Sequence, residues 1–275
     1  MQLSCAGVML DLTQPRIMGI VNVTPDSFSD GGLYHTVTAA VRHAHALIAA
    51  GADIVDIGGE STRPGAVPVD VAVELARVVP VIEAMRGCGA VVSVDTRKPE
   101  VMRAAIAAGA QMVNDVEALQ SAGGLGVVAQ SNVAVCLMHM AGQPQTMQDN
   151  TDDEHIVATV AGFLQMRIQA LLSAGVAKNR IVVDPGFGFG KNLTQNLQLL
   201  KHLHHIMALN YPVLVGMSRK AMLGLMTGRA VDSRLAAGLA AHLYAVTQGA
   251  HIVRVHDVAA CKDALTVWKI IEDTV

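Results

Sequence analysis

Polar side chains that could take part in chemistry follow nearly every short apolar run of this 275-residue chain. Carboxylate and amide groups can fix a ligand through directed hydrogen bonds, and arginine presents forked donors that suit oxyanions. The residues concerned are Asn22, Asp56, Glu60-Ser61-Thr62-Arg63, Asp95-Thr96, Asn114-Asp115, His139, Asp184, Ser218-Arg219-Lys220 and Arg254-His256-Asp257. A fold that brings these positions together would create one polar mouth.

Eight short Val- and Ile-rich runs precede these polar positions and predict β-strands. The runs are residues 17–21, 53–57, 91–94, 111–113, 133–138, 181–183, 213–217 and 251–255. Apolar residues at spacings of three and four fill the intervals and predict helices. Almost wholly apolar strands that alternate with helices indicate a parallel sheet covered by helices. Eight units of about 30 residues predict an α/β fold, a closed (β/α)8 TIM barrel, with its active site at the carboxyl ends of the strands.

Three segments echo one another and support this repeat. Each begins with Gly-Ala, continues through an apolar strand and places a polar residue five positions after the glycine: Gly51 to Asp56, Gly109 to Asn114, and Gly249 to Arg254. We therefore expect a single domain over residues 1–275, with the barrel from about residue 15 to residue 273. A short hairpin could precede the barrel within residues 3–12, although that segment has no strong two-residue turn signal.

Composition excludes several classes of protein. A net charge of −3 and a pI near 6.4 leave no basic face, so nucleic acid is not expected as a partner. The four cysteines are widely spaced without a C-x-x-C pair, which favours reduced thiols in a cytoplasmic protein. No stretch approaches the roughly 18 to 20 uninterrupted apolar residues of a membrane helix, and no membrane association is expected.

One polar loop after an apolar strand carries the most specific signal. It reads Ile17-Met18-Gly19-Ile20-Val21-Asn22-Val23-Thr24-Pro25-Asp26-Ser27-Phe28-Ser29-Asp30-Gly31-Gly32 and resembles the amino-terminal signature of the dihydropteroate synthase family. Further segments match that family: Gly58-Gly59-Glu60-Ser61-Thr62-Arg63-Pro64-Gly65-Ala66, Ser93-Val94-Asp95-Thr96-Arg97-Lys98-Pro99, Met138-His139-Met140 through Gln148, Asp184-Pro185-Gly186-Phe187-Gly188-Phe189-Gly190-Lys191, Gly216-Met217-Ser218-Arg219-Lys220 and Arg254-Val255-His256-Asp257-Val258. The resemblance covers about residues 15 to 270. Ala141 departs from the glutamine expected there, which bears only on the contacts of its own loop.

The resemblance implies a pterin-binding TIM barrel that joins 6-hydroxymethyl-7,8-dihydropterin pyrophosphate to p-aminobenzoate in folate synthesis. A dihydropterin has a flat edge of alternating donors and acceptors, which carboxylates and amides can bind at two points. By resemblance, Asp184 accepts from the ring's amino and N–H donors, and Asn114 and Asp95 bind the pyrimidine and reduced-ring nitrogens. Lys220 donates to the ring carbonyl and to N5.

The resemblance also indicates which residues bind the pyrophosphate and the aryl amine. Asn22 is expected to bind a Mg²⁺ that bridges the phosphates, since hard oxygen donors suit that ion. Arg63, Arg254 and His256 would hold the phosphate oxygens. The aryl amine would enter past Phe189 and contact Ser218 and Thr62, with Phe28 and Pro64 on the loops, and Val255 completes the substrate-binding set. The catalytic group is then Asp95, Lys220, Arg254 and His256, and the family suggests a homodimer.

Two loops are expected to move during the reaction. Residues 23–35 and 59–69 are rich in Gly, Ser, Pro and Asp, so little apolar surface would hold them in place. We expect them to close when pyrophosphate and Mg²⁺ occupy the mouth, which would order binding with the pterin first and the aryl amine second.

Other interpretations stay open at the level of sequence. A pterin-binding methyltransferase of the corrinoid-linked kind would share the barrel and its acidic pocket, although it would not need Asn22, Arg63 and the Arg254-x-His256 pair. A non-catalytic pterin-binding homologue is the other alternative. The histidines His202, His204 and His205 could suggest a metal, but the helical pattern around them favours the solvent side of an amphipathic helix.

Overall fold

Eight parallel strands form the core of the computed structural model, which describes residues 1–24, 32–62, 65–142 and 153–274. The strands are β3 (Arg16–Asn22), β4 (Ile54–Gly58), β5 (Val91–Asp95), β6 (Met112–Asp115), β7 (Ala134–Met138), β8 (Ile181–Asp184), β9 (Leu214–Val215) and β10 (Ile252–Val255). Strands β3 to β8 pair in sequence order, and β10 pairs with both β3 and β9. A parallel bridge between Val183 and Val213 joins β8 to the segment before β9 and completes the circle. The predicted (β/α)8 barrel is confirmed.

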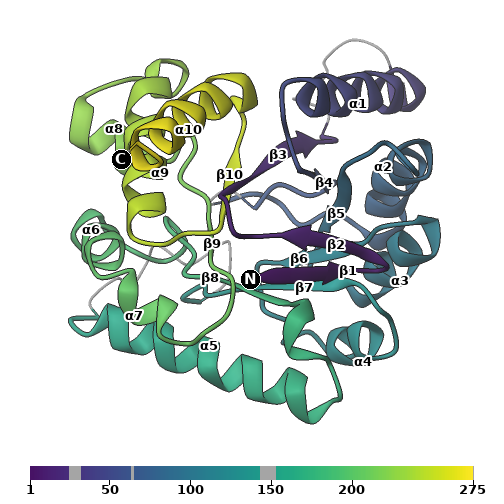
Figure 1. Ribbon diagram of the computed structural model, residues 1–275. Helices are drawn as coiled ribbons and strands as arrows, with labels where there is room; N and C mark the ends of the chain where they lie inside the picture. The colour runs from purple at the N-terminus through teal and green to yellow at the C-terminus, as the bar shows by residue number, and fades with distance from the viewer. Residues whose placement is uncertain (25–31, 63–64, 143–152, 275) are drawn as a thin grey trace.

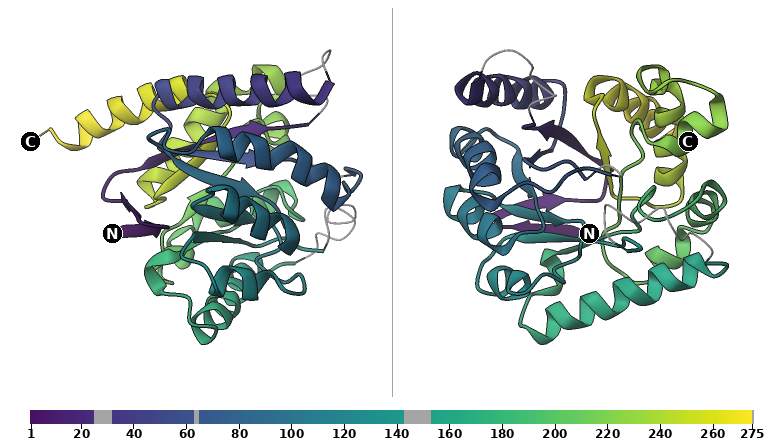
Figure 2. Two further views of the ribbon diagram at one scale, coloured as in Figure 1. Left: turned by 90° about the vertical axis from the view of Figure 1, so that its right-hand side faces the viewer. Right: turned by 180° about the vertical axis from the view of Figure 1, so that it is seen from behind.

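Helices surround this barrel and cover the outer face of the strands (Figures 1 and 2). They are α1 (Gly32–Ala49), α2 (Val71–Ala84), α3 (Pro99–Ala108), α4 (Gly124–Ala129), α5 (Ile156–Ser173), α6 (Leu193–Lys201), α7 (His204–Met207), α8 (Ala221–Thr227), α9 (Leu235–Thr247) and α10 (Val258–Glu272), with 3-10 turns η2 (Lys178–Arg180) and η3 (Val231–Ser233). Local sequence sets several ends. Helix α3 begins at Pro99, whose fixed φ suits a first turn, and ends before Gly109 at φ 114°. Asn192 and Gln195 form a capping box that starts α6.

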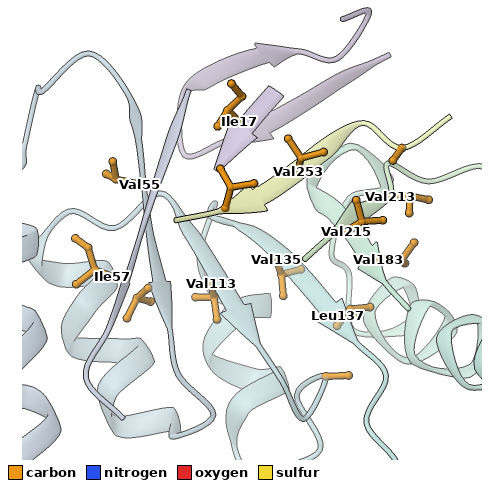
Figure 3. Close-up of a cluster of buried hydrophobic side chains, with 14 of the residues drawn as sticks. Ile17, Val55, Ile57, Val113, Val135, Leu137, Val183, Val213, Val215 and Val253 are labelled. Carbon is orange, nitrogen blue, oxygen red and sulfur yellow. The ribbon is translucent and has the colours of Figure 1, made fainter. Parts of the chain in front are cut away.

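Every second residue of the strands points outward into the layer between barrel and helices. Figure 3 shows this layer, with side chains that include Ile17, Val55, Val113, Val135 and Val253. These residues are at most 1% exposed, and they pack against buried apolar side chains of the surrounding helices. At about 25 cal/mol per Å² of apolar surface removed from water, this layer is the main source of stability.

The alternate residues point inward and change character along each strand. Apolar side chains fill the amino-terminal half of the interior: Met18, Ile54, Val91, Met112, Ala134, Cys136, Val182, Leu214 and Ile252. Two residues further on, four of the strands place Asp56, Asn114, Asp184 and Arg254 on the same inner side. The carboxyl end of the barrel is therefore the polar end.

An antiparallel hairpin closes the apolar end of the barrel. Its strands are β1 (Gln2–Cys5) and β2 (Val8–Asp11), which confirms the hairpin predicted within residues 3–12. Leu3, Cys5 and Leu12 are at most 4% exposed and pack against the inner apolar residues. The hairpin crosses the middle of the molecule in Figure 1 and lies at one end of the barrel in Figure 2, left.

Helix α5 is the one described helix long and apolar enough, by length and composition, to cross a membrane. One face of it is buried against the barrel, through Ile156, Val160, Leu164, Ile168 and Leu171. Arg167 in the same helix donates to the carbonyls of Ala118 and Leu119 at 2.8 and 3.0 Å. These contacts are those of a barrel helix, so length and composition are weak evidence for a membrane span here.

A buried histidine ties α9 to the loop that follows β9. His242 is 2% exposed; its Nε2 accepts from the Met217 backbone N–H at 3.2 Å, and its Nδ1 lies 2.7 Å from the Gly238 carbonyl. This pattern needs a neutral ring with the proton on Nδ1. Burial lowers the pKa of His242 to about 4.

We expect acid to weaken the fold through His242. Between pH 6.5, the ordinary pKa of histidine, and pH 4, the approximate pKa of His242 in the folded protein, the ring is protonated in the unfolded chain but neutral in the folded one. The contribution of His242 to stability is therefore complete above pH 6.5 and falls as the pH drops through this window. The loss is up to about 3 kcal/mol. Urea unfolding at pH 7 and pH 5 should show a smaller pH dependence in His242→Gln than in the wild type. Exposed His45→Gln is the matched control, and equal pH dependence in all three proteins would contradict the assignment.

Candidate active site

A half-buried arginine links three strands inside the polar end of the barrel. Arg254 on β10 donates from Nε to Asp56 Oδ2 and from Nη2 to Asp95 Oδ2, both at 2.7 Å. Asn114 on β6 donates from Nδ2 to the same Asp56 oxygen at 2.9 Å. Because β10 is separated from β4 and β5 by at least one strand, the guanidinium reaches across the barrel interior. The sequence predicted Asp95, Asn114 and Arg254 as site residues but not this connection between them.

Burial and charge oppose one another in this cluster. Asp56 is 0% exposed, and its Oδ1 has no hydrogen-bond partner among the described residues. Burial raises the pKa of Asp95, and the Arg254 guanidinium opposes that shift. Burial also lowers the pKa of Arg254, but Asp56 and Asp95 outweigh it, so that pKa lies above its ordinary value. The arginine is therefore a permanent cation between two carboxylates.

A second cluster lies at the ends of β8 and β9. Asp184 accepts the Gly186 backbone N–H on Oδ1 at 2.7 Å. Lys220 donates to the Phe187 carbonyl, and its Nζ lies 3.9 Å from the centre of the Phe189 ring, a cation–π contact. Burial lowers the pKa of Lys220 to about 7 and raises the pKa of Asp184. Asp184, Lys220 and Phe189 are thus brought together, as the sequence predicted.

The two clusters face one interior space. The charges of Asp184, Arg254 and Asp95 all act on the pKa of Lys220, which places these groups within electrostatic reach of it. Two glycines lie next to charged residues of these clusters. A Cβ on Gly58 would approach Asp95 at 3.5 Å, and one on Gly216 would approach Arg254 at 3.6 Å. Neither glycine adds side-chain bulk beside the acidic and basic groups.

A third group lies at the rim. His256 Nδ1 is 2.9 Å from Ser218 Oγ, which also accepts the His256 backbone N–H at 3.3 Å. The neighbouring Arg219 forms an ion pair with Asp257 at 2.9 Å. Ser218 and His256 thus come together from the ends of β9 and β10, next to the Arg254 cluster.

The remaining predicted residues are placed less directly. Asn22 ends β3 beside Gly58 of β4, half-buried at the polar end. Thr62 is half-buried in the segment that leads to α2. The Val255 side chain packs in the outer layer with the helices, so only the Val255 backbone is on the side of the site. Arg63, Phe28, Pro64 and most of the predicted closing segment in 23–35 lie outside the described residues.

Sequence reasoning placed Asp56 at the polar mouth without giving it a role, and it did not select Lys191. Both were visible in the sequence, Asp56 as a strand-end acid and Lys191 at the end of the Gly-rich loop. Asp56 pairs with the distant Arg254, and Lys191 donates to the distant His139 carbonyl as well as to two carbonyls of its own loop. His202 follows α6 and is half-buried, whereas His204 and His205 are exposed at the start of α7. Their position toward solvent is as predicted, but two helices and not one carry them.

A groove of about 820 Å³ lies at the opposite end of the barrel, between the hairpin and the starts of β4 to β7. Its charged side chains are already engaged. Arg86 donates to the carbonyls of Ala107 and Ala108, and Asp53 pairs with Arg16 at 3.0 Å. The groove contains none of the predicted site residues, and the polar end remains the candidate active site.

Comparison with known proteins agrees with this geometry. A family described as pterin binding enzyme matches residues 18–256. Dihydropteroate synthase of Escherichia coli K12 is 47% identical over 275 residues, which is 100% of this chain and 96% of that protein. The Xanthomonas albilineans dihydropteroate synthase structure with 4-aminobenzoic acid is 54% identical and has a TM-score of 0.94. The match covers 100% of this chain and 99% of that one. The same enzyme with 7,8-dihydropteroate is 51% identical, has a TM-score of 0.91, and both chains are covered completely. The chain therefore belongs to the dihydropteroate synthase family of pterin-binding enzymes.

Proposed function

We propose that this chain condenses 6-hydroxymethyl-7,8-dihydropterin pyrophosphate with p-aminobenzoate to give 7,8-dihydropteroate and pyrophosphate. The observation that carries the proposal is the gathering of acidic, amide and basic groups at the polar end of the barrel. The acidic and amide groups are Asp95, Asn114 and Asp184, and the basic groups are Lys220 and Arg254. Solved relatives with the same fold contain 4-aminobenzoic acid or 7,8-dihydropteroate, which are a substrate and the product of the proposed reaction.

Pterin recognition would use the two inner clusters. Asp184 uses one oxygen for the Gly186 N–H, which fixes the carboxylate so that its other oxygen can accept from the ring. Asn114 gives its amide N–H to Asp56, which orients its carbonyl oxygen as an acceptor for a ring N–H. Lys220 supplies the donor for the ring carbonyl and N5. Fixed donors and acceptors of this kind favour one orientation of the ring.

The chemical step needs charge stabilisation more than proton transfer. Loss of pyrophosphate leaves positive charge on the pterin methylene, and Asp95 can stabilise it from a low-dielectric site. Arg254 holds Asp95 in place and contributes a fixed positive charge near the leaving group, as does Arg63 by resemblance, while His256 can donate to it from the rim. The attacking aryl amine is neutral at pH 7, so this arrangement needs no strong general base.

The residues present fit a Mg²⁺ ion at the mouth. Asn22 offers a hard amide oxygen at the end of β3, and protein-bound Mg²⁺ usually takes one or two protein ligands together with substrate phosphates and water. We propose Asn22 as that ligand. When bound, the ion would neutralise charge on the leaving pyrophosphate.

We also propose a homodimer through α8, α9 and α10. Large apolar side chains are exposed along these helices and η3: Leu225, Met226, Val231, Leu235, Tyr244, Val267, Ile270 and Ile271. The three helices lie together on one side of the barrel in Figure 1. Exposed apolar patches of this extent are typical of protein interfaces, and a second copy presents the same patch.

The four cysteines are free thiols, and we propose a cytoplasmic location.

The reaction itself is the first test. Purified protein with both substrates and Mg²⁺ should release pyrophosphate and form 7,8-dihydropteroate, and omission of the aryl amine or of Mg²⁺ should suppress release. Transfer of a methyl group to a corrinoid instead would favour the methyltransferase alternative. Pterin binding without any turnover would identify a non-catalytic homologue.

Two substitutions should separate chemistry from stability. Lys220→Met and Arg254→Met should each lower kcat/KM by at least about 100-fold, because each removes a charge that faces the substrate. Arg254→Met should also cost about 3 kcal/mol of unfolding free energy, since it leaves Asp56 buried without its cation. Lys220→Met should stay within about 1 kcal/mol of the wild type, because folding already disfavours the charged lysine. Urea denaturation and steady-state kinetics measure both, and equal destabilisation by the two variants would refute the division of roles.

Two variants, one inside and one outside the apolar patch, test the proposed dimer. Ile270→Asp on α10 places a charge in the proposed interface, and Met166→Asp does the same on the outer face of α5; the two side chains are 63% and 65% exposed. Sedimentation equilibrium should show a monomer for Ile270→Asp and an unchanged dimer for Met166→Asp. A monomeric wild type, or a dimer in both variants, would place the apolar patch outside any interface.

A further inference from the structure

Lys191 is a buried ammonium surrounded by backbone carbonyls. It is 3% exposed, and its Nζ donates to the carbonyls of Gly186, Phe189 and His139 at 2.8, 3.0 and 3.3 Å. No carboxylate among the described residues forms an ion pair with it. Burial lowers its pKa to about 7, opposed by the Asp184 charge and reinforced by the charge of Lys220. Burial of a cation with only dipoles around it is costly, so the contacts it makes need an explanation.

The three carbonyls belong to two segments that approach each other closely. Gly186, Gly188 and Gly190 all have positive φ, between 65° and 79°, so the loop after β8 turns repeatedly. A Cβ on Gly186 would lie 1.9 Å from the His139 carbonyl oxygen, and one on Gly190 would lie 2.6 Å from that of Ala141. Neither position tolerates a side chain. Lys191 donates to carbonyls on both segments and so joins the end of β7 to the loop after β8.

The same loop holds the groups assigned to the pterin. Gly186 donates to Asp184, the Phe187 carbonyl accepts from Lys220, and the Phe189 ring lies under the Lys220 ammonium. Asn196 on α6 accepts the Gly188 N–H at 2.7 Å and thereby ties the loop to the first turns of that helix. Two lysines therefore bind successive carbonyls of one loop: Lys191 those of Gly186 and Phe189, and Lys220 that of Phe187.

We propose that Lys191 is a positioning residue for pterin binding, which acts through the Gly186 and Phe189 carbonyls to hold Asp184, Phe189 and Lys220 in their binding arrangement. The inference deepens the proposed function and rests on it. Without the Lys191 donor, the Phe189 carbonyl would lose the hydrogen bond from Nζ, the Gly186 carbonyl would keep only the Phe189 backbone N–H at 3.1 Å, and the loop would be held less firmly. Phe189 and the carbonyl that accepts from Lys220 would move with the loop.

The test compares pterin affinity in folded proteins. Calorimetric titration of 6-hydroxymethyl-7,8-dihydropterin pyrophosphate, without aryl amine, should give a Kd at least about 10-fold weaker for Lys191→Met than for the wild type. Lys191→Arg keeps the charge and the donors in a bulkier group and should weaken binding less, by about threefold. Exposed Lys201→Met at the end of α6 is the matched control and should bind like the wild type.

The outcomes are distinct. If Lys191→Met does not fold, the titration of Lys191→Gln decides, because this variant removes the charge and shortens the side chain, and a wild-type Kd in it overturns the inference. A lower Tm of a folded Lys191→Met with an unchanged Kd would show that the lysine serves stability alone, which also overturns it. A wild type that does not bind the pterin would reject the proposed function together with the inference, whereas normal wild-type binding with equal binding by the variants would reject the inference alone.

Discussion

The ion pairs of Arg254 with Asp56 and Asp95 are the constraint on which the rest of the site depends. One guanidinium spans the barrel interior and fixes carboxylates from two strands, and through Asp56 it also orients Asn114. A carboxylate as deeply buried as Asp56 requires such a partner, because removal of one member of a buried pair costs several kcal/mol. Pocket geometry and barrel integrity are therefore coupled through one side chain.

The barrel supports this cluster by separating apolar and polar layers along its axis. The hairpin of β1 and β2 and the inner apolar residues close the amino-terminal half, so water is excluded beneath the charged groups. The low dielectric that results strengthens the interactions of Asp95, Lys220 and Arg254, and it also shifts their pKa values away from the ordinary ones. The same burial that makes the site costly to fold makes it effective toward charge that develops in a bound substrate.

The sequence predicted the strands and the polar residues at their ends because both depend on local pattern, whereas the roles of those residues were implied by the family resemblance. Each predicted run overlaps an observed strand, although β9 is only Leu214–Val215, and polar residues such as Asn114 and Asp184 follow from their position at strand ends. The pairing of Arg254 with Asp56 was not predictable, because it joins residues far apart in sequence and depends on the register at which the barrel closes. The Lys191 contacts were missed for a different reason. The Gly186 and Phe189 carbonyls are close to Lys191 in sequence, but a lysine beside glycines gives no sign that they will converge on it together with the distant His139 carbonyl. The roles of the site residues stay predictions.

A double-mutant cycle on Asp56 and Arg254 tests the central claim most directly. The free energies of unfolding of Asp56→Asn, Arg254→Met and the double variant, measured by urea denaturation, give the coupling between the two side chains. The account predicts a coupling of about 2 kcal/mol or more, with the double variant more stable than the sum of the single losses implies. Additive losses would contradict the claim that this ion pair organises the polar end of the barrel.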